Sequence, residues 1–140
     1  MKIRKPKRKD WKLIVELLNS EETLKNIKDI IYKKGDALQF LKDSEKTLIL
    51  EKDKKIIGLV SGTFFKQAGI LMIHFLVIKK ENRKKGLAKL LLKEITELVK
   101  GEINRIILYS GINNKPMTKL MKGLKYKKGE EMFVFYKFVR

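Results

Sequence analysis

One junction in this 140-residue chain restricts its fold more than any other feature, because an apolar segment runs through a basic, glycine-containing turn directly into a helical pattern. Residues 70–78 are rich in Ile, Leu, Phe and Val, which is typical of a buried strand. After the turn, apolar residues recur at helical spacing, so we expect a helix over residues 84–100. The order of strand, turn and helix predicts a domain that mixes α and β structure.

The turn has the chemistry of an anion-binding site. The first N–H groups of a helix have no partner within the helix, and the helix dipole adds partial positive charge there. Arg83, Lys84 and Lys85 precede Gly86, and both Gly86 and Ala88 are too small to keep a ligand from the backbone. A pyrophosphate would fit this turn. The spacing matches neither the dinucleotide-binding glycine pattern nor the P-loop, and a solvated basic connection is the alternative interpretation.

Composition limits the class of protein. A length of 140 residues with 44% hydrophobic content predicts one domain over residues 1–140. No apolar run is long enough to span a bilayer and the basic N-terminus lacks a secretory signal, so we expect a cytoplasmic protein without membrane association. Because the chain has no Cys and a single His, we expect no disulfide, no thiolate nucleophile and no metal site.

The net charge of +18 is the second conspicuous feature of the chain. Such a field attracts polyanions, including nucleic acid, a ribosomal surface, an acidic protein and phosphorylated small molecules. The Lys residues are spread through every segment, so compositional bias is the alternative interpretation. Charge by itself therefore selects no partner, and a weak association with nucleic acid or the ribosome stays open.

Hydrophobic periodicity predicts elements along the whole chain. The three strands between residues 47 and 78 are joined by short polar turns, which predicts an antiparallel meander. The expected strands cover residues 2–6, 47–51, 56–65, 70–78, 105–110, 124–127 and 132–139. The expected helices begin after an N-cap at Asp10, run from residue 20 or 21 to 32, from 37 to 41 and from 84 to 100, and begin again near Pro116.

Two motifs resemble the GNAT superfamily of N-acetyltransferases. In that family a strand ending in Val or Ile is followed five residues later by Arg/Gln-x-x-Gly-x-Gly/Ala, and here Ile78 precedes Arg83-Lys84-Lys85-Gly86-Leu87-Ala88 by this interval. Residues 108–114 and 123–126 resemble the family's strand, Asn-containing loop and Gly-Phe-Lys ending, with Leu124 in place of Phe. The resemblance covers the whole chain and implies a mixed α/β fold, with a mostly antiparallel sheet of about six or seven strands flanked by about four helices.

The resemblance also implies acetyl-CoA as the cosubstrate. Its pyrophosphate would bind the turn, and its pantetheine arm would lie along the end of the preceding strand, where an N–H near Leu76 would polarise the thioester carbonyl. Asn113 and Asn114 lie in the corresponding loop, although a simple turn pair is the alternative for them. The cofactor-binding residues expected in this way are Leu76, Val77, Ile78, Arg83, Lys84, Lys85, Gly86, Leu87, Ala88, Lys89, Asn113 and Asn114.

The implied reaction is direct attack of an amine on the thioester, which requires a base and an acid. Where some family members place a catalytic Glu this chain has His74, whose imidazole suits proton transfer near neutral pH, and a structural His is the alternative. The family's acid is a Tyr, but the corresponding positions here are Lys119 or Met121. Tyr109 and Tyr126 are near enough in sequence to replace it, and we take Tyr109 as the candidate. Unassisted departure of the thiolate is a further alternative.

The sequence therefore predicts an N-acetyltransferase that uses acetyl-CoA to modify a primary amine of a small molecule or a protein, and dimers are common in the family that it resembles. Two alternatives stay open. The missing Tyr would also suit a CoA-binding regulatory module without transfer activity. The basic surface would also suit a nucleic-acid-binding protein, with contacts from Trp11 and the cluster at residues 7–9.

Overall fold

A computed structural model describes residues 1–20, 31–43, 46–133, 135 and 137–139. The chain divides into two compact units. The first, here called the sheet unit, comprises Met1–Thr23 and Ile31–Tyr109, and the second, the C-terminal unit, comprises Leu24–Ile30 and Ser110–Arg140.

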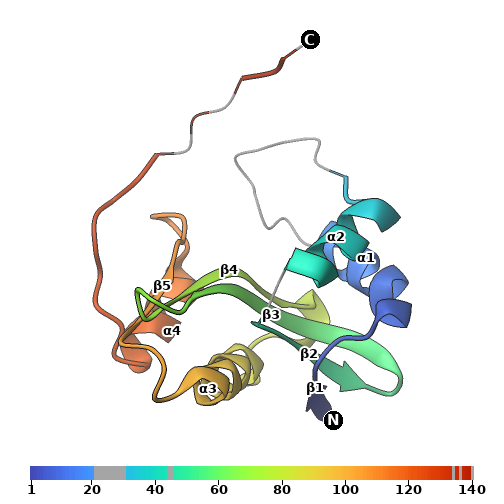
Figure 1. Cartoon of the computed structure of the whole chain (residues 1–140), viewed down its shortest axis with the longest axis horizontal. Helices are drawn as coiled ribbons and strands as arrows, with labels where there is room; N and C mark the ends of the chain where they lie inside the picture. The colour runs from blue at the N-terminus through green and yellow to red at the C-terminus, as the bar shows by residue number, and fades with distance from the viewer. Residues whose placement is uncertain (21–30, 44–45, 134, 136, 140) are drawn as a thin grey trace. The chain divides into compact units, whose positions relative to one another are not determined.

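The sheet unit is built on one five-stranded sheet with the strand order β1-β2-β3-β4-β5 (Figure 1). Neighbouring strands pair antiparallel, except that β4 and β5 pair parallel. The expected meander over residues 47–78 is therefore confirmed, and the sheet is mixed and mostly antiparallel. The strands are β1 (Lys2–Arg4), β2 (Lys46–Lys52), β3 (Lys55–Phe65), β4 (Ile70–Ile78) and β5 (Arg105–Leu108).

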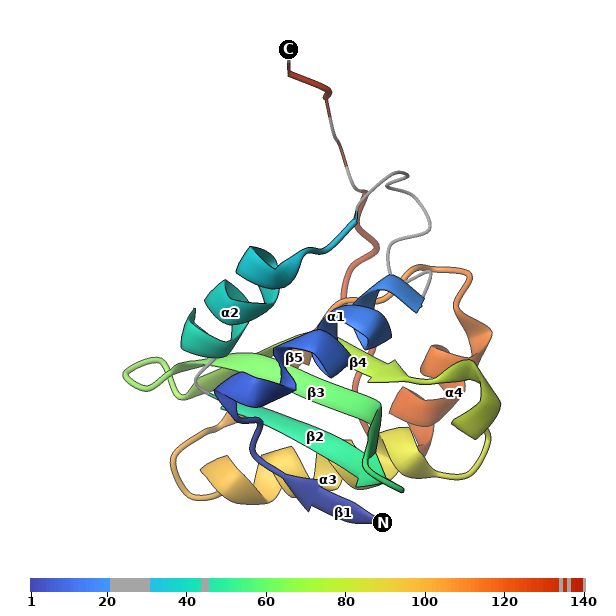
Figure 2. The same ribbon diagram turned by 90° about the vertical axis from the view of Figure 1, so that its right-hand side faces the viewer.

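Helices cover both faces of this sheet. Figure 2 shows α1 (Trp11–Ser20) and α2 (Lys34–Asp43) on one face and α3 (Leu87–Val99) on the other. Two short 3-10 helices, η1 (Arg8–Asp10) and η2 (Lys80–Asn82), precede α1 and α3. Because both faces are covered, β3 is buried almost continuously rather than at alternate positions.

Cross-strand register divides the core between the two faces. Ile49, Leu59 and Val77 pair across β2, β3 and β4 and belong to one buried cluster with Ile14 and Leu17 of α1. This cluster fixes α1 over the centre of the sheet, since burial of large aliphatic side chains is the main favourable term in folding.

The other face depends on a glycine. A Cβ at Gly58 would lie 2.8 Å from Cδ1 of Ile78 and 3.3 Å from Cδ1 of Leu91, a residue of α3. Any side chain at Gly58 would therefore push against the helix that follows the basic turn. The absence of a side chain lets α3 lie close against β3 and β4 and so fixes the position of its N-terminus.

The C-terminal unit contains α4 (Lys115–Gly123), which begins near Pro116 as expected. The predicted strands at residues 124–127 and 132–139 are wrong for the described residues. The described part of the chain therefore has five strands, all of them in the sheet unit, rather than six or seven. The backbone N–H of Leu124 donates to Leu120 and that of Tyr126 to Met121, so these groups terminate the helix instead of joining a ladder. Lys125 has a φ of 64°, which is incompatible with an extended strand.

Two further helix predictions differ from the structure in detail. The helix after the basic turn begins at Leu87 rather than at residue 84, because Lys84 and Gly86 both have positive φ angles. Most of the helix expected at residues 20 or 21 to 32 lies outside the described residues, and residues 31–33 are not helical. Across the described segments, no helix has both the length and the apolar character needed to cross a bilayer.

Candidate active site

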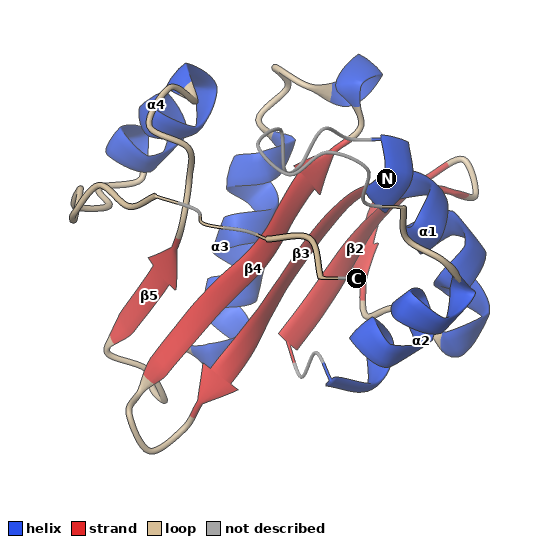
Figure 3. Cartoon of the chain, turned by 90° about the horizontal axis from the view of Figure 1, so that it is seen from above, coloured by secondary structure: helices blue, strands red, loops and turns tan. Residues whose placement is uncertain are grey.

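The candidate site begins where two neighbouring strands part. The parallel pairing of β4 with β5 runs from Ile70 and Arg105 to Ile73 and Leu108. Strand β4 continues to Ile78 with no further β5 partner among the described residues, and Figure 3 shows the two strands diverging toward their C-terminal ends. Residues 74–78 thus form a segment of β4 that does not pair with β5.

A β-bulge lies at the same point. Ser61 of β3 pairs with Phe75, whereas the next residue, Gly62, pairs with Ile73, so His74 is an extra residue on β4. Bulges bend a strand and redirect its side chains, and they occur often next to active sites. The bulge thus accompanies the parting of the strands.

Backbone hydrogen bonds show which groups face the unpaired side. The N–H of Lys79 donates to the carbonyl of Ile57 at 2.8 Å, so the backbone N–H and C=O groups of Lys79 point toward β3. Because directions alternate along a strand, Leu76 and Ile78 point their N–H and C=O groups away from β3, toward the side that β5 has left. The Ile78 carbonyl accepts a hydrogen bond from Nε of Arg83 at 2.9 Å. The Leu76 N–H therefore faces the unpaired side of β4.

The basic turn has the geometry of an anion site. Gly86 precedes α3 with a φ of 75°, and the N–H of Leu90 donates to the Gly86 carbonyl at 3.1 Å. The N–H groups of Leu87, Ala88 and Lys89 thus precede the first bond within the helix. No atom lies within 4 Å of a Cβ built at Gly86, so the approach to these groups is open. The side chains of residues 83–85 are exposed and positively charged.

His74 is held by a neighbour that the sequence did not point to. Its Nε2 lies 2.8 Å from Oγ1 of Thr63 on β3, and the His74 side chain is exposed. The adjacent Phe75 packs edge-on against Phe40 of α2, with ring centroids 5.3 Å apart. Sequence reasoning missed Thr63 because its proximity to His74 depends on the bulge, which has no clear sequence signal.

Tyr109 lies at the end of the same opening. The last residue pair between β4 and β5 is Ile73 with Leu108. Tyr109 comes directly after Leu108, and His74 comes directly after Ile73. The Tyr109 side chain is 62% exposed. The structure thus brings both candidate catalytic residues to the point where the strands part.

The remaining candidates belong to the C-terminal unit and have local structural roles. Oδ1 of Asn114 accepts from the N–H of Met117 at 3.2 Å and so caps α4, and the carbonyl of Asn113 accepts from Lys115 at 3.0 Å. These contacts agree with the turn interpretation of the Asn pair. Lys119 is exposed.

Tyr126, the other candidate for the acid, follows α4 and is not part of a strand. Burial raises the pKa of the Tyr126 phenol above its ordinary value. Among the described residues, no group of three or more His, Asp or Glu side chains could hold a metal ion.

A mixed sheet that parts beside a helix N-terminus is the arrangement that the resemblance to the GNAT superfamily implied. Residues 11–126 match the model of the Acetyltransferase (GNAT) family, so the chain belongs to this family. The expected family and the mixed α/β fold are therefore confirmed, and the protein is an acetyltransferase.

Solved structures support the fold. An acetyltransferase of the GNAT family from Streptococcus pneumoniae is 25% identical, with a TM-score of 0.72 over 89% of this chain and 82% of that chain. A ribosomal-protein-alanine N-acetyltransferase from Brucella melitensis biovar Abortus 2308 is 17% identical, with a TM-score of 0.76 over 98% of each chain. Diaminobutyrate acetyltransferase EctA from Paenibacillus lautus, in complex with L-2,4-diaminobutyric acid and coenzyme A, is 17% identical, with a TM-score of 0.73 over 88% of this chain and 73% of that chain. No curated protein matches the sequence.

Proposed function

We propose that this protein transfers the acetyl group of acetyl-CoA to a primary amine by direct attack of the amine on the thioester. One observation carries the proposal: β4 runs beyond its pairing with β5, turns the Leu76 N–H toward the unpaired side and leads directly into the anion-binding turn. A strand edge followed by a phosphate site matches a ligand that has an amide-containing arm and a pyrophosphate.

The turn suits the pyrophosphate for reasons of charge and space. The N–H groups of residues 87–89 come before the first bond within α3, a Cβ at Gly86 would meet nothing within 4 Å, and residues 83–85 are basic and exposed. Leu76, Val77 and Ile78 would bind the pantetheine arm through the backbone. Acetyl-CoA supplies the thioester carbonyl, and the Leu76 N–H is positioned to stabilise the negative charge that develops on its oxygen.

His74 is the proposed base. If its Nε2 carries the proton and donates to Oγ1 of Thr63, then Nδ1 is left as the acceptor for the proton of the attacking amine. Thr63 then fixes the ring orientation. Tyr109 is the proposed proton donor for the departing thiolate, since it lies at the same end of the strand opening.

The acceptor is a primary amine of a small molecule or a protein, and its identity is left open. The similar solved structures include a ribosomal-protein-alanine N-acetyltransferase and a diaminobutyrate acetyltransferase with its bound substrate. Enzymes of similar fold therefore acetylate amines of very different size. We further propose that residues 1–140 act as one cytoplasmic domain, since the family match extends over both compact units.

The first test is thermal stabilisation by acetyl-CoA. A ligand that binds only the folded state adds about 2.7 kcal/mol at one hundred times its dissociation constant, so the melting temperature should rise by several degrees. In Gly86→Glu a carboxylate occupies the anion site, and the rise should disappear. Gly101→Glu is the matched control, because Gly101 also has a positive φ and open space around its Cβ.

Loss of the shift in Gly86→Glu but not in Gly101→Glu would support the cofactor site and justify a screen of amines for CoA release. No shift in the natural protein at millimolar acetyl-CoA would contradict the proposed function.

A further inference from the structure

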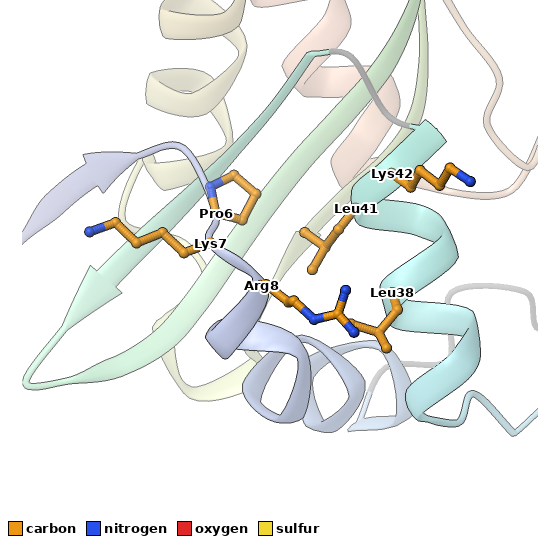
Figure 4. Close-up of a pocket in the computed structure, with 6 residues that line it drawn as sticks. All are labelled: Pro6, Lys7, Arg8, Leu38, Leu41 and Lys42. Carbon is orange, nitrogen blue, oxygen red and sulfur yellow. The ribbon is translucent and has the colours of Figure 1, made fainter.

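The sheet unit has a hollow of about 260 Å³ between the loop that follows β1 and helix α2. Figure 4 shows its lining, which combines three cationic side chains with three aliphatic ones. None of the lining residues comes from the strand end or the turn assigned to acetyl-CoA. They are Pro6, Lys7, Arg8, Leu38, Leu41 and Lys42.

One wall of the hollow is fixed by a partly buried ion pair. The Asp10 carboxylate accepts hydrogen bonds from the N–H of Lys7 at 2.6 Å and from Nη1 of Arg4 at 2.9 Å. The N–H of Asp10 in turn donates to the Lys7 carbonyl at 2.9 Å, and the Asp10 residue is only 4% exposed. The backbone that carries Lys7 and Arg8 is therefore preorganised, which reduces the entropy lost when these cations bind a partner.

The other wall is the face of α2 that looks toward this loop. Leu38 and Leu41 are one helical turn apart and are both half-buried. Figure 4 shows the Arg8 side chain extending toward Leu38 and the Leu41 side chain directed toward the loop. All charged residues of the lining are cationic, and its three aliphatic residues are here called the aliphatic floor.

We propose that this hollow is a docking site for an acidic segment of a partner protein. One apolar side chain of the segment enters between Leu38 and Leu41, and carboxylates on either side of it pair with Lys7, Arg8 and Lys42. Charge complementarity and the apolar floor together select this occupant.

Other occupants fit these features less well. The volume is below the range of about 300–1,000 Å³ that small-molecule sites usually have. Proteins that bind single-stranded nucleic acid without sequence preference stack its bases on aromatic side chains, and this lining has none. A small inorganic anion would leave the aliphatic floor uncovered.

The test uses the full chain and a fluorescein-labelled peptide with one Leu flanked by three Glu on each side. Fluorescence anisotropy should show that Arg8→Glu weakens binding by about tenfold. Lys93→Glu is the matched control, because Lys93 is exposed on α3 and its substitution changes the net charge equally, and it should weaken binding less than about threefold. Replacing the peptide's Leu by Ser should weaken binding about fivefold, as should Leu38→Gln in the protein.

Equal effects of Arg8→Glu and Lys93→Glu would overturn the proposal, because binding would then reflect only the overall charge. Equal affinity for the Leu and Ser peptides would also overturn it. So would a single-stranded oligonucleotide of the same charge that binds more tightly than the peptide and loses affinity selectively in Arg8→Glu. The readout is binding without acetyl-CoA, so failure here leaves the proposed acetyl transfer unaffected.

Discussion

The guanidinium of Arg4 donates two hydrogen bonds to the carboxylate of Asp10, with Nη1 2.9 Å from Oδ2 and Nη2 3.0 Å from Oδ1. This ion pair joins β1 to the residue that precedes α1. Nε of Arg4 also lies 3.1 Å from Oε2 of Glu51 on β2. One guanidinium therefore ties the first strand, the first long helix and the second strand together, and it supports the loop that lines the proposed docking hollow.

Replacing Asp10 by Asn should destabilise the protein by about 2–3 kcal/mol, because Arg4 would lose its buried counter-charge. Glu51→Gln is the matched control on the same guanidinium. The Glu51 side chain is 28% exposed, so its loss should cost less than about 1 kcal/mol. Urea unfolding at neutral pH measures both values, and an equal cost for the two variants would contradict the assigned difference.

The contribution of Asp10 should also depend on pH. Hydrogen bonding to Arg4 is the largest effect that holds the pKa of the Asp10 carboxyl below its ordinary value. A depressed folded-state pKa adds stability above the unfolded-state pKa of about 3.9, and this stability is lost as pH falls toward the folded-state pKa. The difference between the natural protein and Asp10→Asn should therefore shrink between pH 6 and pH 3. A constant difference over this interval would disprove the linkage.

Gly69→Ala should cost about 1 kcal/mol more than Gly101→Ala. Both glycines have a positive φ, so both substitutions share the backbone strain. A Cβ at Gly69 would also lie 2.8 Å from Nδ2 of Asn104, whereas nothing lies within 4 Å at Gly101. The Gly69 carbonyl accepts from the N–H groups of Asn104 and Arg105, so the clash would disturb the start of β5. Thermal melts of the two variants test this, and equal melting temperatures would count against it.

Lys54→Gly should stabilise the protein by about 0.5–1 kcal/mol, against the usual effect of glycine. Asp53 and Lys54 have φ angles of 51° and 61° in the two-residue turn between β2 and β3, a conformation that glycine adopts at lower cost. Lys55→Gly is the control. Because Lys55 lies within β3, this substitution should destabilise the protein. Denaturant midpoints measure the two changes, and a lower midpoint for Lys54→Gly would refute the turn argument.

His74→Ala should lower kcat by about 100-fold and leave the KM for acetyl-CoA unchanged, because a base acts on the amine proton rather than on cofactor binding. Thr63→Val should lower kcat by about five- to tenfold, since it removes the hydrogen bond that orients the ring. Thr63→Ser retains the hydroxyl and should remain near the natural rate. CoA release with the best amine of a screen gives these values. If Thr63→Val and Thr63→Ser behaved alike, Thr63 would not position the base.

Much of the fold could be predicted because its signals are local. The bounds of β4 at residues 70–78 are those expected from its apolar run, and α1 and α3 bury the residues that recur at helical spacing. The closing strands at residues 124–127 and 132–139 could not be judged in the same way. A β-rich composition does not by itself provide a neighbouring strand to pair with. The N–H groups of Leu124 and Tyr126 also donate to carbonyls of α4, so they are not available to pair with another strand.

The candidate site divides along the same line. The geometry of its basic turn was predictable, since Gly86, the basic residues before it and the helix after it are contiguous in the chain. The pairing of His74 with Thr63 was not predictable, because one extra residue in the β4 register decides which side chains meet.

Local sequence is sufficient to specify the strand, turn and helix that form the proposed anion site, because hydrophobic period and glycine placement act over a few neighbouring residues. Three features depend instead on tertiary packing: the point where β5 leaves β4, the direction of the Leu76 N–H, and the meeting of Arg8 and Leu38 in one hollow. Those features arise from register and packing between segments far apart in the chain, and their free energies appear only when the sheet and its helices assemble together.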